Sequence, residues 1–176
     1  MFLVGAAFFS MWYFLSLYLQ NVLGYGALKA GFAFFPMAVA IIVGAQTSSR
    51  LLPRTGVRPL LQAGTVLATV GFAGLALIGA GSSYWSAGFG PACLVSLALG
   101  LLFTPLAAAA TAGVDRTEAG LASGVLNTAR QMGGSLGLAV LATIAIDRTH
   151  SALGDHHTGA KAALTSGYTW AFAVTA

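Results

Sequence analysis

Apolar stretches of about twenty residues, the length that crosses a bilayer as a helix, recur along this chain and restrict its fold more than any other feature. Charged residues make up 7% of the sequence, whereas 57% of its residues are apolar. A soluble domain is about one-quarter charged, because its surface must be hydrated. So few charges cannot cover a soluble surface, and we therefore expect most of the chain to lie in lipid as α-helices.

The apolar stretches predict about five full membrane spans and part of a sixth. We place these spans at about residues 2–19, 28–46, 59–80, 87–110, 119–146 and 167–176. The first stretch lacks a preceding basic region and is as long as a span, so we interpret it as a span and not as a signal peptide. The last stops after about half the length of a span, so we expect a truncated chain. The expected fold is all-α, a single polytopic transmembrane domain over residues 1–176.

A stripe of small and polar residues follows one face of the fifth predicted span. Its members recur every three or four residues, which places them on one side of a helix. They are Gly120, Ser123, Gly124, Asn127, Arg130, Gln131, Gly134 and Ser135. The opposite face consists of Leu121, Val125, Ala129, Met132 and Leu136. Polar residues within membrane spans usually face a bundle interior or a watery pathway, so this stripe indicates transport.

Arg130 is the central residue of the stripe. At about 1.5 Å per residue it lies about 16 Å into the span, near the middle of a bilayer core about 30 Å thick. Arginine keeps its charge there and must be paired or hydrated. We expect Arg130, with Asn127 and Gln131 one turn to either side, to belong to a transport pathway or to an interface between two transporter halves. The alternative is a structural arginine bonded to backbone carbonyls at a helix kink.

Two pairs of glycines in the same span have the spacing that allows membrane helices to pack closely. Gly120 and Gly124 form one pair, Gly133 and Gly137 form the other, and Gly134 lies beside the second. We expect these glycines to pack against a neighbouring helix. In a transporter that moves by rocking, the same contact would also be a sliding surface.

Basic residues are concentrated between the second and third predicted spans. Arg50, Arg54 and Arg58 lie within residues 47–58, and Gly56 suits a tight turn. Short basic loops of plasma-membrane proteins face the cytoplasm, so we expect residues 47–58 to form a cytoplasmic loop. The arginines would set the topology; alternatively, they tether helix ends and bias an inward–outward equilibrium.

Three strings of residues carry a family resemblance. The most specific covers residues 123–137 and reads SGVLNTARQMGGSLG; the others cover residues 18–25 and 50–59. Together they resemble the fourteen-span drug:proton antiporters, the EmrB/QacA-type branch of the major facilitator superfamily. The resemblance implies half of a major facilitator helical bundle, corresponding to the C-terminal half, with the N-terminal half as its missing partner. It also implies proton-coupled efflux of small amphipathic or cationic compounds by alternating access.

Acidic residues are absent from the predicted spans, because Asp115, Glu118, Asp147 and Asp155 fall in predicted loops. Proton carriers within membranes are usually carboxyl groups whose pKa is raised by burial. We therefore expect the proton site in the missing half. The aromatic residues of the first span, with Phe32, Phe34 and Phe35, either line an apolar cavity for drugs or, more simply, pack and face lipid.

No catalytic centre, metal site or cofactor is expected. His150 and the sequence Asp155-His156-His157 are interpreted as residues of a solvated loop. Basic and aromatic residues do not alternate as nucleic-acid binding requires. Two functions stay open: a transporter fragment, and a non-transporting membrane remnant or helper that packs against other helices. A membrane enzyme is the least favoured class.

Overall fold

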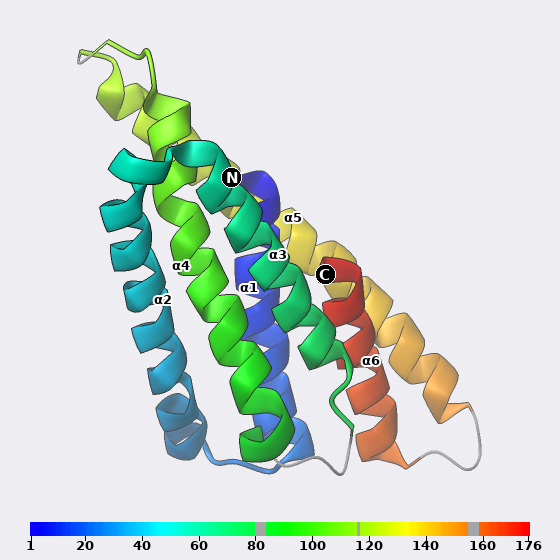
Figure 1. The fold of residues 1–176 in the computed structure, drawn as a ribbon. Helices are drawn as coiled ribbons and strands as arrows, with labels where there is room; N and C mark the ends of the chain where they lie inside the picture. Colours follow the sequence, from blue (N-terminus) through cyan, green and yellow to red (C-terminus); the bar gives the residue numbers. More distant parts are fainter. Residues whose placement is uncertain (80–83, 116, 155–158) are drawn as a thin grey trace.

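The computed structural model describes residues 1–79, 84–115, 117–154 and 159–176, and over these residues the only regular secondary structure is helical (Figure 1). The α-helices are α1 (Phe2–Leu17), α2 (Ala27–Thr55), α3 (Val57–Ala76), α4 (Phe89–Thr111), α5 (Ala119–Leu153) and α6 (Ala160–Thr175). Two π-helical turns, η1 (Tyr18–Val22) and η2 (Tyr84–Gly88), precede α2 and α4. The predicted all-α fold is confirmed. Five helices, α2 to α5 and α1 extended by η1, are long and apolar enough to cross a membrane.

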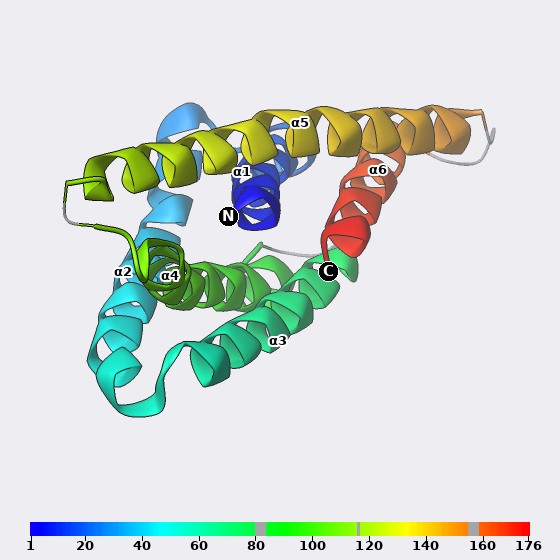
Figure 2. The same cartoon turned by 90° about the horizontal axis from the view of Figure 1, so that it is seen from above.

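The helices lie side by side in two groups. Helices α2 and α3 both pack against α4, whereas α1 and α6 both pack against α5. Seen from above, α5 runs along one side of the molecule, and α2, α4 and α3 form the opposite side (Figure 2). Helix α1 lies between α5 and α4, and α6 bridges α5 and α3 (Figure 2). Helices α4 and α5 also contact each other directly.

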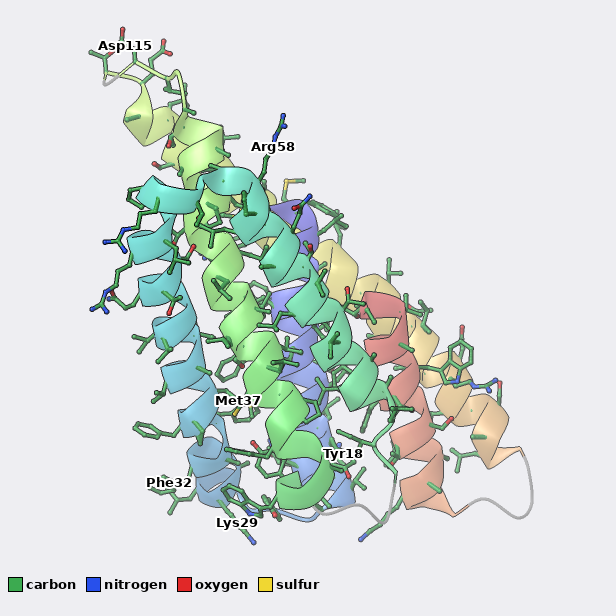
Figure 3. All side chains as sticks on the ribbon, in the orientation of Figure 1. Tyr18, Lys29, Phe32, Met37, Arg58 and Asp115 are labelled. Carbon is green, nitrogen blue, oxygen red and sulfur yellow. The ribbon has the colours of Figure 1, made fainter. Side chains whose placement is uncertain are left out.

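The buried core lies mainly between α1, α3, α4 and α6. Its largest enclosed side chains include Phe14, Phe72 and Phe172, and the ring of Phe172 contacts both of the other rings. Large apolar side chains also cover much of the outside. Phe32, for example, is 70% exposed and points away from α2 (Figure 3). An apolar exterior around an apolar core suits a molecule surrounded by lipid.

Helix α2 is longer than the span predicted for it. Residues 47–55, expected in a loop, form its last turns, so the connection to α3 is a single residue, Gly56, with a φ of 80°. Polarity suggested a loop, but a helix of 29 residues is about 43 Å long and extends beyond a bilayer core of about 30 Å. A polar segment at its end can therefore stay helical in water.

Helix α5, like α2, continues past the end of its predicted span. Asp147 was expected in a loop, but it lies within α5, which continues to Leu153. The predicted start of α5 after Glu118 agrees with the helix, which begins at Ala119. Helix α6 begins at Ala160, earlier than the last predicted span. The loop residues Asp155, His156 and His157 lie outside the described residues.

Candidate functional site

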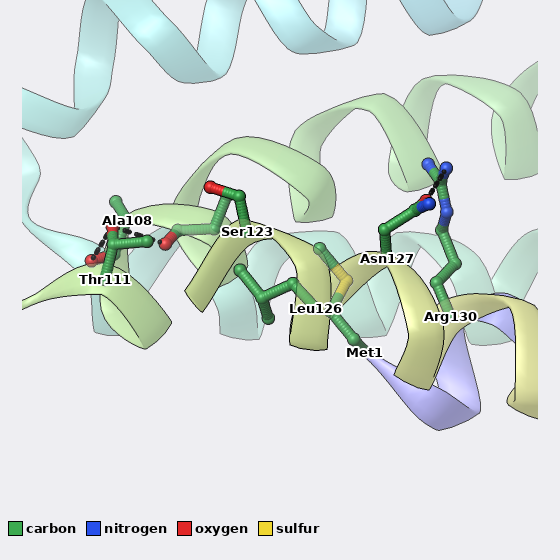
Figure 4. Close-up of a pocket in the computed structure, with 8 residues that line it drawn as sticks. Met1, Ala108, Thr111, Ser123, Leu126, Asn127 and Arg130 are labelled. Carbon is green, nitrogen blue, oxygen red and sulfur yellow. Dashed lines mark hydrogen bonds between the residues drawn. The ribbon is translucent and has the colours of Figure 1, made fainter. Parts of the chain in front are cut away.

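A pocket of about 410 Å³ lies between the first part of α5 and the last turns of α4 (Figure 4). Its lining consists of Met1, Ala107, Ala108, Thr111, Ser123, Leu126, Asn127 and Arg130. Ser123, Asn127 and Arg130 follow one another at the spacing of helical turns and extend from the same side of α5. The polar stripe of the sequence thus contributes three neighbouring side chains to one pocket.

Arg130 and Asn127 are in direct contact in this pocket. The guanidinium Nη2 donates a hydrogen bond of 2.7 Å to the side-chain oxygen Oδ1 of Asn127. The guanidinium carbon lies 5.7 Å from the centre of the Phe103 ring on α4, a cation–π geometry. Within the described residues, no carboxylate forms an ion pair with Arg130. Its hydrogen-bond partner is a neutral side-chain amide and not a backbone carbonyl, so its positive charge is not compensated.

Gln131, the third predicted pathway residue, lies elsewhere. It is exposed on α5 and does not belong to the lining of the pocket. The structure therefore brings Arg130 and Asn127 together and leaves Gln131 on a different part of the helix surface.

The two glycine pairs of α5 differ in their surroundings. A Cβ at Gly133 would collide with the backbone of Phe2, and one at Gly137 would collide with Ala6, because α1 lies directly against this part of α5. At Gly134 the neighbour is the ring of Phe9, also on α1. Gly120 and Gly124 have no such neighbour within 4 Å. In the described part of the chain, Gly133 and Gly137 thus pack against α1, whereas Gly120 and Gly124 stay uncovered.

Sequence reasoning missed the residue that contacts the backbone of Arg130. Gly5 of α1 is buried, and a Cβ there would collide with the carbonyl of Arg130. Gly5 and Gly133 are thus placed on facing helices so that α1 and α5 approach closely beside the pocket. The available signal was a run of small residues, Gly5 with Ala6 and Ala7, within a span rich in aromatic residues.

A row of aromatic side chains begins at Phe103, which contacts Arg130 but does not line the pocket. Phe103 contacts Phe8 of α1 at 5.8 Å between ring centres, and Phe8 contacts Trp12 at 6.0 Å. Trp12 in turn stacks on Phe34 of α2, with ring centres 4.8 Å apart and an angle of 17°. All four are partly buried. The indole Nε1 of Trp12 is enclosed and has no hydrogen-bond partner in the described part of the chain.

The aromatic residues singled out from the sequence therefore divide into two groups. Phe34 belongs to the row, whereas Phe32 and Phe35 are 70% and 68% exposed on the outside of α2.

The arginines of residues 47–58 lie at the end of the molecule that also carries Asp115 (Figure 3). Arg50 and Arg54 belong to the last turns of α2, and Arg58 lies in the first turn of α3, beyond Gly56. All three are exposed. Among the described residues, no group of three His, Cys, Asp or Glu side chains is arranged to hold a metal ion.

Comparison with known sequences identifies the family. The profile of the Major Facilitator Superfamily matches residues 1–138. The chain belongs to the major facilitator superfamily. The five helices that are long and apolar enough to cross a membrane fit a multi-pass membrane protein of this superfamily.

Several curated relatives of this major facilitator chain carry names of antibiotic export or resistance. The cephamycin export protein CmcT of Amycolatopsis lactamdurans is 41% identical over 98% of this chain and 34% of its own length. The puromycin resistance protein pur8 of Streptomyces alboniger is 36% identical over 94% of this chain and 34% of its own length. The tetracenomycin C resistance and export protein of Streptomyces glaucescens is 32% identical over 84% of this chain and 27% of its own length. The chain thus spans about one-third of the length of the curated relatives that it matches most fully.

Proposed function

We propose that this protein exports small amphipathic compounds across the plasma membrane by proton-coupled antiport, and that the chain supplies the C-terminal half of a fourteen-span drug:proton antiporter. The pocket that holds Arg130 and Asn127 carries this proposal. A charged residue in the apolar middle of a membrane helix is costly and usually marks a pathway for a solute. The export and resistance names of several relatives support the same function.

Alternating access of two helical halves around a site near the midplane is the proposed mechanism. This chain would contribute one wall of that site, with Arg130 and Asn127 facing the pathway. Gly133, Gly134 and Gly137 would hold α5 on α1, and Gln131 would face the other half. Gly120 and Gly124, uncovered in this chain, would form the surface on which the N-terminal half packs and slides.

The proton carrier is proposed to lie in the N-terminal half. Of the described acidic residues, Asp115 and Glu118 precede α5, and Asp147 is exposed near its other end. None of them lines the pocket that contains Arg130. The charged end of α2 and α3, with Arg50, Arg54 and Arg58, would be cytoplasmic and would set the topology.

The test is the variant Arg130→Ala in the full-length protein. We expect export of a fluorescent amphipathic compound to be lost while the amount of protein in the membrane stays normal. The matched control is Arg148→Ala, because Arg148 lies on the same helix, is exposed, and contacts Trp170 far from the pocket. Normal efflux by the Arg130→Ala variant would contradict the proposal.

A non-transporting helper that packs against other helices is the second candidate. The uncovered surface around Gly120 and Gly124 favours it, because small residues of this spacing bind membrane helices closely. The same assay separates the two functions: a helper would be inserted in the membrane and would export no compound, whatever residue occupies position 130.

A further inference from the structure

The charge of Arg130 has no counter-charge in the described part of this chain. Glu118 lies twelve residues earlier, about 18 Å along the helix, and Asp147 lies seventeen residues later, about 25 Å along it. A guanidinium cannot lose its charge at any physiological pH. An isolated charge within the bilayer core is costly, so a negatively charged group that reaches the pocket would be attracted strongly.

The polar side chains of the pocket are arranged as donors. The oxygen of Asn127 accepts from Arg130, so the amide N–H groups of Asn127 stay available to donate. The hydroxyl of Ser123 has no hydrogen-bond partner among the described residues. The hydroxyl of Thr111, by contrast, already donates to the carbonyl of Ala107 at 2.9 Å. Arg130 and Asn127 together form a site for an oxyanion, since a carboxylate accepts several hydrogen bonds at once; Ser123 lies seven residues, about 10 Å, from Arg130 along the helix.

An apolar surface for the rest of such a molecule lies beside these donors. Ala107, Ala108 and Leu126 line the same pocket as Arg130 and Asn127. The apolar part of a bound molecule would be removed from water against these side chains.

We propose that the substrate of this pocket is an amphipathic carboxylic acid, with the carboxylate on Arg130 and Asn127 and the apolar part along Ala107, Ala108 and Leu126. This inference rests on the proposed export function and names the substrate class of the same site. It excludes cationic compounds as preferred ligands of the pocket, because the guanidinium repels them and no carboxylate is in the lining.

The experiment compares three compounds that share one ring system and differ in charge: pyrenebutyrate, pyrenebutanol and pyrenebutylamine. Binding to the purified full-length protein and export from cells are measured for the unaltered protein and for Arg130→Gln. We expect the unaltered protein to bind the acid at least roughly tenfold more tightly than the alcohol, and the amine most weakly, because hydrogen bonds to charged groups give this difference. Arg130→Gln should remove the preference of binding for the acid over the alcohol.

Two further variants test the geometry. Asn127→Asp places a carboxylate beside the guanidinium and should also remove the preference for the acid, since the charge of Arg130 is then compensated. Arg130→Lys keeps the charge without the planar fork and should retain part of the preference. A merely structural arginine would not produce this order among the three compounds.

Other outcomes overturn the inference in distinguishable ways. If the unaltered protein exports none of the compounds and no other amphipathic compound, the proposed function itself fails. If it exports them and Arg130→Gln leaves the ratio of acid to alcohol unchanged, the inference fails while the proposed function stands. If Arg130→Gln weakens binding of all three equally at normal membrane levels, Arg130 pairs with an acidic residue of the protein and not with the substrate.

Discussion

Gly44 of α2 and Gly100 of α4 face each other where these two helices cross, and each fits there because it lacks a side chain. A Cβ at Gly44 would lie 3.2 Å from the Cα of Gly100, and one at Gly100 would lie 3.0 Å from the backbone nitrogen of Ala45. This close approach brings the hydroxyl of Ser48 within 2.9 Å of the Leu101 carbonyl, to which it donates a hydrogen bond. The helix group around α4 therefore depends on backbone contact as well as on apolar side chains.

Gly100→Ala is expected to destabilise the protein by about 1–3 kcal/mol, because the added methyl group forces α2 away from α4. The measurement is the thermal unfolding midpoint of the purified protein in detergent. Gly90→Ala is the matched control, since Gly90 lies on the same helix and has no neighbour within 4 Å. Equal midpoints for the two variants would mean that the crossing is not tight.

On α5, the glycine pairs are expected to respond differently to the same change. Gly133→Ala should lower the unfolding midpoint, because its methyl group would collide with the backbone of Phe2. Gly124→Ala should leave the midpoint nearly unchanged, since its surroundings in this chain are open. If Gly124→Ala reduces export without a change in midpoint, its surface contacts the other transporter half; equal destabilisation by both variants would contradict the packing described.

The helices and the polar face of α5 follow from local pattern. The spacing of Ser123, Asn127 and Arg130 fixes them on one side of a helix whatever that helix packs against. Charge and hydropathy likewise identify apolar stretches, because these are properties of short segments. Charge and hydropathy do not determine where a helix ends. Polar residues such as Arg54 and Asp147 extend their helices into water, where hydropathy no longer distinguishes a helix from a loop.

Contacts between distant segments could not be read from the sequence. Gly5 lies against the carbonyl of Arg130, more than a hundred residues away, and only the packing of α1 on α5 brings them together. The aromatic row has the same origin, because Phe8, Phe34 and Phe103 belong to three different helices. Nothing in the sequence distinguishes Phe34 from its neighbour Phe35, although only Phe34 stacks on Trp12.

The orientation in the membrane can be tested with single cysteines. Arg58 and Lys29 lie at opposite ends of the molecule (Figure 3), and Cys93 is the one cysteine of the sequence. In a Cys93→Ser background, Arg58→Cys should react with a membrane-impermeant maleimide only after the cells are opened. The end with the arginines is proposed to be cytoplasmic, because basic residues are retained on that side of the membrane. Lys29→Cys lies at the opposite end and should therefore react in intact cells. The reverse labelling pattern would overturn the proposed topology.

Tyr84 is expected to stabilise the junction between η2 and α2. Its side chain is completely buried, and its hydroxyl donates a hydrogen bond of 2.9 Å to the carbonyl of Ala33. Tyr84→Phe removes the donor and keeps the ring, so it should cost about 0.5–1.5 kcal/mol and lower the thermal unfolding midpoint. Tyr13→Phe is the control, because Tyr13 is 44% exposed and its hydroxyl has no hydrogen-bond partner among the described residues. An unchanged midpoint for Tyr84→Phe would mean that the hydroxyl finds an equally good partner elsewhere, and the stability of this junction would then come from the packing of the ring alone.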